Sequence, residues 1–270
     1  MYFLFVLGCP IKECRAELEW FLDELKSFRD VGSGFWHRHF QGALDLLSQG
    51  YSEERYEDFM GKVWYVEEEG LYERDERSFD AWTSFVHFLA VTILGDPRSQ
   101  QDVAETCKHL LNRPIHGADM ACTFLWDALA AVSVLPEQNV WTRRKLRRVV
   151  RRRLKSIKMF TVYSREFCHG KACLLEAELA ALSPTGHHRA ILSYDSAIAL
   201  SASANLFLDE AIATERAGRF LAKIGRDSEA TEYINQAITA YERYGAVAKT
   251  EQLSQVLSLT TKTSPSVPAN

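Results

Sequence analysis

Apolar residues recur at the spacing of an α-helix along almost the whole chain, and hardly any segment alternates as a β-strand would. Between residues 74 and 94, Trp82, Phe85, Val86, Leu89 and Ile93 stand at offsets 0, 3, 4, 7 and 11, which places them on one helix face. The same pattern predicts helices over 119–135, 141–160, 165–182, 188–201, 206–224, 228–244 and 246–257. This periodicity restricts the chain to an all-α fold.

The breaks between these segments are short and are marked by proline or glycine, as at Pro97, Pro136, Gly225 and Gly245. Helices joined by loops of about three to six residues pack as antiparallel neighbours. The sequence therefore predicts antiparallel helix pairs, stacked as a tetratricopeptide-like superhelix, over 31–258. An N-terminal helix, or the edge of a truncated domain, is expected within 1–30, and a disordered tail over 259–270, which has few apolar residues to bury.

A small–large–small pattern occurs twice in the last hundred residues. The residues that carry it are Ala190, Tyr194 and Ala197 and, forty residues later, Ala230, Ile234 and Ala237. In a helix-turn-helix repeat, small residues let the partner helix approach closely, and the large residue fills the gap between neighbouring pairs. Gly218 stands twelve residues before Ala230, where a tetratricopeptide repeat keeps a small residue for the helix crossing. The clearest repeats are thus predicted over 164–244.

The formal net charge of −4 conceals one strongly basic segment, RRKLRRVVRRRLKSIK, over 143–158. Its ten cations are Arg143, Arg144, Lys145, Arg147, Arg148, Arg151, Arg152, Arg153, Lys155 and Lys158, and it contains no acidic residue. The apolar residues between them, Leu146, Val149, Val150, Leu154 and Ile157, form one helical stripe that we expect to be buried.

Three interpretations of this basic helix stay open. It is a solvated face that pairs with acidic residues elsewhere in the chain, or a calmodulin-like target. In the third interpretation it is a contact surface for an anionic partner, which would be a nucleic acid, an acidic lipid or an acidic protein. Like charges four residues apart on a helix repel each other. Either nearby acidic helices or an anionic ligand must therefore offset the ten cations.

Cysteine is sparse and irregularly spaced, with six residues in 270 and no Asn-x-Ser/Thr sequon, which favours a reducing, cytoplasmic setting. Cys168, His169 and Cys173 lie close together, but on a helix only His169 and Cys173 share a face. A structural zinc site needs four ligands. We therefore expect these residues to be packing positions and expect no metal. No run of about 18 apolar residues predicts a membrane span.

Common catalytic motifs do not occur in the sequence. It contains no GxxxxGK[ST], GxSxG, HExxH or CxxC pattern, and the lone glycine pair Gly32 and Gly34 has no strand ahead of it. His37 and His39 diverge on the helix that the following apolar residues predict. We expect no catalytic site and no cofactor, and keep an enzyme with an unfamiliar site as a third possibility.

Two stretches match motifs of a known family. EFCHGKACLLEAELA, over 166–180, aligns with NF.HK..LLEAE.AR, with Glu166 in place of asparagine. YINQAITAYERYGAVAKTEQL, over 233–253, aligns with YLR.A...Y..WGA.AK...L, with Tyr244 in place of tryptophan. In these stretches the chain resembles the tetratricopeptide-like region of large predicted-ATPase sensor kinases, which are similar in plan to signal-transduction ATPases with numerous domains. The resemblance extends over 28–257 and is clearest from Met120 onward.

In that family, a kinase-like region and an AAA-type ATPase precede the helical region, and a GAF domain and a histidine kinase often follow it. The resemblance implies that this chain is the helical arm alone, without the ATPase, kinase and GAF parts. We therefore expect a non-catalytic, cytoplasmic scaffold that binds protein partners or adjoining signalling domains. The alternative is an adaptor that binds an anionic partner through 143–158.

Overall fold

The computed structural model of the chain describes residues 8–28, 41–49, 54, 93 and 119–263. Regular structure in these residues is helical and no strand occurs among them, which confirms the all-α class. Several sequence predictions lie outside the described residues: all but Ile93 of the apolar face over 74–94, the turn at Gly32 and Gly34, the pair His37 and His39, and the tail beyond Thr263.

The helices begin and end within a few residues of the positions that periodicity predicts. Their bounds are α2 Ile11–Phe28, α7 Asp119–Ser133, the 3₁₀ helix η2 Leu135–Glu137, α8 Val140–Phe160, α9 Arg165–Ala181, α10 His187–Ser203, α11 Phe207–Lys223, α12 Asp227–Tyr244 and α13 Val247–Thr263. The largest difference is at α13, for which the periodicity predicts an end at Leu257. Residues 259–263 continue this helix, so they do not belong to a disordered tail.

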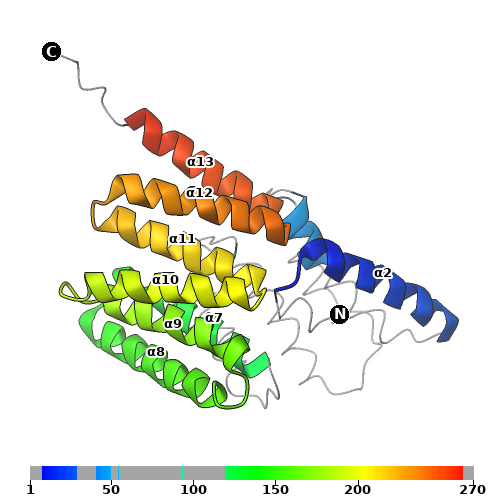
Figure 1. The fold of residues 1–270 in the computed structure, drawn as a ribbon, viewed down its shortest axis with the longest axis horizontal. Coiled ribbons are helices and arrows are strands. Elements are labelled where there is room, and N and C mark those ends of the chain that lie inside the picture. The colour runs from blue at the N-terminus through cyan, green and yellow to red at the C-terminus, as the bar shows by residue number, and fades with distance from the viewer. Residues whose placement is uncertain (1–7, 29–40, 50–53, 55–92, 94–118, 264–270) are drawn as a thin grey trace.

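Helices that follow one another in the chain lie side by side. Figure 1 shows α8 to α13 in succession across the molecule, from green to red, with α7 behind α9. The hairpins α9–α10 and α11–α12 have the most extensive contacts, and α10 also packs on α11. α8 contacts both α7 and α9, and α13 packs on α12.

The repeated small–large–small pattern lies in the core between these helices. All six of its residues are buried: Ala190, Tyr194, Ala197, Ala230, Ile234 and Ala237. Gly218 of α11 lies where α12 comes closest, because a Cβ atom there would stand 2.9 Å from Ile234 Cδ1 and 3.2 Å from the carbonyl oxygen of Ala230. The crossing of α11 and α12 therefore has room for a hydrogen atom but not for a methyl group.

Gly245 ends α12 in the left-handed conformation, with φ +95°. Its N–H donates to the carbonyl of Tyr241 at 2.8 Å, and the N–H of Ala246 donates to the same carbonyl at 3.0 Å. These bonds satisfy a carbonyl at the helix end, and glycine adopts this conformation without steric cost. The start of α2 lies against this turn, since a Cβ atom on Gly245 would be 3.3 Å from that of Ile11.

Two ion pairs join α9 to α11, and in each pair the partners are 38 residues apart. Lys171 donates to Asp209, and Arg216 donates to Glu178. Lys171 is 1% exposed. Burial by itself lowers the pKa of Lys171, but Asp209 outweighs burial and the net shift is upward. The order of charges along α9, lysine then glutamate, is reversed along α11, aspartate then arginine.

Candidate functional site

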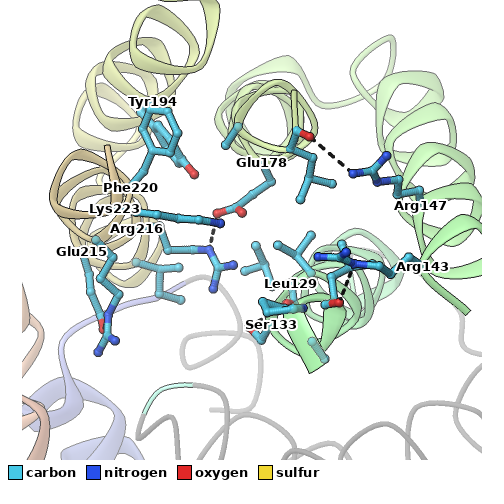
Figure 2. Close-up of a pocket in the computed structure, with 18 of the residues that line it drawn as sticks. Leu129, Ser133, Arg143, Arg147, Glu178, Tyr194, Glu215, Arg216, Phe220 and Lys223 are labelled. Carbon is cyan, nitrogen blue, oxygen red and sulfur yellow. Dashed lines mark hydrogen bonds and ion pairs between the residues drawn. The ribbon is translucent and has the colours of Figure 1, made fainter. Parts of the chain in front are cut away.

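A cavity of about 400 Å³ lies among α7, α8, α9 and α11. Figure 2 shows these helices around it, with Tyr194 of α10 at its side. Residues 241 and 249, from α12 and α13, also reach its lining. Among the described residues, the lining contains six cations, Arg143, Arg147, Arg216, Arg219, Lys223 and Lys249, and two carboxylates, Glu178 and Glu215.

α8 contributes Arg143 and Arg147, which are four residues apart and point from the helix into the cavity (Figure 2). Arg143 Nε donates to the carbonyl of Leu135 at 3.0 Å, and Arg147 Nη2 donates to the carbonyl of Leu182 at 3.3 Å. These bonds tie both guanidinium groups to main chain rather than to a carboxylate. Arg147 Nε is buried and has no hydrogen-bond partner in the described part of the chain.

The opposite wall holds the pair between Arg216 of α11 and Glu178 of α9. Glu178 is buried. Burial alone would lower the pKa of Arg216, but the adjacent Glu178 raises it, so the guanidinium stays charged. Glu178 is therefore neutralised by Arg216.

Glu215 is the second carboxylate of the lining, and three groups surround it. Its Oε1 lies 2.9 Å from Lys249 Nζ and 2.8 Å from Arg219 Nε, and its Oε2 accepts from the Tyr241 hydroxyl at 2.7 Å. Burial alone would raise the pKa of Glu215, but Lys249 and Arg219 outweigh it, and the pKa is lowered. Burial also lowers the pKa of Lys249, with Glu215 opposing that shift.

Both carboxylates are thus already paired, whereas Arg143, Arg147 and Lys223 have no carboxylate partner among the residues that the structure describes. Much of the rest of the lining is apolar: Leu129, Ala130, Val132, Leu135, Ala181, Leu182, Ile212 and Phe220. The hydroxyl of Ser133 donates to the carbonyl of Leu129 at 3.0 Å. The cavity has the chemistry to hold a negatively charged group that carries an apolar neighbour.

The structure divides the ten cations of the basic helix into three groups. Arg143 and Arg147 line the cavity. Arg153 pairs with Asp127 at 2.6 Å, and Lys158 pairs with Glu176. The remaining six are exposed, and no carboxylate pairs with them within the described ranges: Arg144, Lys145, Arg148, Arg151, Arg152 and Lys155. We call these six residues the outer basic face.

The apolar stripe of this helix faces the protein. Val150 and Ile157 are fully buried, while Leu146, Val149 and Leu154 are half-buried. Spacing along the sequence predicts one surface for the ten cations, because it does not tell which neighbours α8 has. It also does not single out Glu178, Glu215, Arg216, Arg219, Lys223 and Lys249, the residues that complete the charged lining.

Cys168 and Cys173 are buried in α9, with His169 half-buried between them. Burial raises the pKa of both thiols. In the described part of the chain, no group of three or more His, Cys, Asp or Glu residues is placed to hold a metal ion.

Comparisons with known proteins return no relative. No family model matches the chain, and neither a curated protein nor a solved structure matches it. Among the helices described, none is both long enough and apolar enough to cross a membrane.

Proposed function

We propose that the chain is a non-catalytic, tetratricopeptide-like scaffold whose cavity binds an acidic segment of a partner protein. The two buried small–large–small triplets and the stacked helix pairs support the repeat architecture. The motifs over 166–180 and 233–253 support a role as the interaction arm of an ATPase-linked signalling protein. Such an arm holds partner proteins or adjoining signalling domains together.

The observation that carries this proposal is the buried Nε of Arg147, which has no hydrogen-bond partner in the described residues. Beside it, Arg143 donates to a main-chain carbonyl and pairs with no carboxylate of the described chain. A buried donor without an acceptor is costly, and the cost is larger when the group is charged. A ligand carboxylate would remove this cost, because the planar guanidinium group can donate two parallel hydrogen bonds to it.

The size and lining of the cavity further restrict which kind of ligand can bind. A volume of about 400 Å³ lies in the range of small-ligand pockets, about 300–1,000 Å³, so it accommodates a short segment rather than a folded surface. Phe220 and the leucines of the lining add apolar surface between the charged groups of the cavity. The segment that fits best has an acidic residue next to an apolar one.

A binding measurement tests the cavity directly. A fluorescein-labelled peptide of alternating glutamate and leucine should bind to the full chain, and its glutamine–leucine counterpart should not. The double variant Arg143→Gln, Arg147→Gln should bind the acidic peptide at least about tenfold more weakly, because one hydrogen bond to a charged group contributes about 1.5–3 kcal/mol.

The matched control removes two charges from the same helix on its outer side. Arg148→Gln, Arg151→Gln should leave peptide affinity nearly unchanged, since both residues are exposed and neither lines the cavity. If both double variants weaken binding equally, the peptide responds to net charge alone and the cavity is not its site.

A second candidate function is an adaptor that uses the basic helix itself to bind an anionic partner. The observation that favours it is the outer basic face, whose six exposed cations have no carboxylate beside them in the described residues. This surface and the cavity lie on different sides of α8, so one function does not exclude the other.

A further inference from the structure

The outer side of α8 carries large apolar residues as well as cations. Nine large apolar residues are exposed in the described part of the chain, and five of them lie between residues 140 and 163: Val140, Trp141, Met159, Val162 and Tyr163. Trp141 is 78% exposed and Tyr163 is 87% exposed. A concentration of this kind on one helix and its following turn marks a contact surface rather than a random scatter.

Trp141 and Met159 stand at the two ends of one line along α8. They are 18 residues apart, and at about 100° per residue this is five full turns, so both side chains leave the helix in the same direction. The distance between their Cα atoms along the axis is about 27 Å, at about 1.5 Å per residue. Buried Val150 and Ile157 lie on the other side of the helix.

The outer basic face fills the space between these two apolar ends. Arg148, Arg152 and Lys155 lie within about 40° of the line from Trp141 to Met159, at about 100° per residue. The guanidinium of Arg144 lies over the ring of Trp141, 5.6 Å from its centroid. Val162 and Tyr163 extend the apolar end beyond Met159 into the turn before α9.

We propose that the outer side of α8 docks on the surface of an anionic lipid bilayer, with α8 parallel to the membrane plane. Lys and Arg attract anionic headgroups, while Trp and Tyr favour the interface between headgroups and acyl chains. A nucleic acid would satisfy the cations but would leave Met159 and Val162 without an apolar environment. The combination of charge between two apolar ends therefore favours lipid.

This inference is independent of the cavity and its peptide ligand. Arg143 and Arg147 point into the cavity, not toward the docking side (Figure 2). Docking through the outer basic face would hold the scaffold at a membrane that no helix of the described part could cross.

Vesicle co-sedimentation of the full chain tests the proposal. The chain should bind vesicles of phosphatidylcholine mixed with phosphatidylserine and not vesicles of phosphatidylcholine alone. Arg148→Gln, Arg151→Gln, Arg152→Gln should reduce the partition coefficient about a hundredfold, because each cation near an anionic surface contributes about fivefold. The control Lys12→Gln, Arg189→Gln, Arg226→Gln removes three exposed cations outside α8 and should reduce the partition coefficient far less.

The apolar ends need their own measurement. The difference in fluorescence between the wild-type chain and Trp141→Phe isolates the emission of Trp141, which should shift to shorter wavelength when phosphatidylserine vesicles are added. Val162→Ser, Tyr163→Ser should weaken vesicle binding and should weaken it more at high salt, where the electrostatic contribution is screened.

Three results would overturn the proposal: no binding to phosphatidylserine vesicles, an equal loss in both triple variants, or an unshifted Trp141 emission in the bound state. The last measurement tests whether the chain binds labelled duplex DNA or labelled single-stranded RNA. Binding of either one that depends on Arg148, Arg151 and Arg152, without vesicle binding, would assign the surface to nucleic acid instead.

Discussion

The ammonium group of Lys171 in α9 donates a hydrogen bond to the carboxylate of Asp209 in α11, and both side chains are buried. Lys171 also donates to the carbonyl of Phe167 at 3.1 Å and lies over its ring, 3.7 Å from the centroid. The cation thus has a carboxylate, a carbonyl and an aromatic face around it, which together replace the water that it loses on folding.

We expect Lys171→Met to destabilise the fold by about 3–5 kcal/mol, because it leaves the buried carboxylate of Asp209 without its partner. The double variant Lys171→Met, Asp209→Leu should recover most of this loss, since it removes both buried charges. Urea unfolding followed by circular dichroism measures both. A double variant that is no more stable than the single one would show that the pair matters through shape and not through charge.

Glu215 makes the fold sensitive to acid. Its pKa is lower in the folded chain than the usual 4.5, so its charged form stabilises the fold above that value and this contribution is lost as the pH falls through the folded pKa. We expect Glu215→Gln to lower stability at pH 7 and to flatten its decline below about pH 5. The urea midpoint of unfolding, measured from pH 3 to pH 7 in steps of about 0.5 pH unit, tests this prediction. Exposed Glu242→Gln, the control, should leave the slope unchanged.

Ala230→Leu tests the repeat assignment. Ala230 is 5% exposed, and its carbonyl lies against the place of the missing Cβ of Gly218. The larger side chain should overpack the crossing of α11 and α12 and cost about 1–3 kcal/mol. The same change at exposed Ala222 should alter stability by less than about 0.5 kcal/mol. An Ala230→Leu chain with an unchanged melting temperature would contradict this packing.

The start of α8 depends on one capping residue. Asn139 Oδ1 accepts a hydrogen bond from the N–H of Thr142 at 3.0 Å, and the first turn holds no acidic residue to interact with the helix dipole. We expect Asn139→Ala to cost about 1 kcal/mol. Asn139→Asp keeps the acceptor and adds a negative charge near Arg143, so it should be at least as stable as the wild-type chain. A loss of stability in both variants would show that the cap does not act through this bond.

Periodicity predicted the helices from residue 119 onward because local spacing decides which face of each helix is apolar. The burial of Tyr194 and Ile234 followed from the same local pattern. The cavity could not be predicted in this way, because it depends on which side of α8 meets α9 and on the pairing of Glu178 with Arg216 across two helices.

One sequence signal for the buried charges was present. Lys171 and Glu178 interrupt an apolar face of α9, and Asp209 and Arg216 follow each of them by 38 residues with the opposite charge. This distance is close to the forty-residue repeat that the alanine triplets show. Looking for opposite charges at the repeat distance would have found both pairs.

The reversed order of charges on α9 and α11 has a consequence for how copies of these two helices could be arranged. A second α9 placed in parallel in the position of α11 would set Lys171 against a lysine and Glu178 against a glutamate. A second α11 placed in the position of α9 would likewise set Asp209 against an aspartate and Arg216 against an arginine. The two helices are therefore not interchangeable, because the two ion pairs form only when one α9 lies beside one α11.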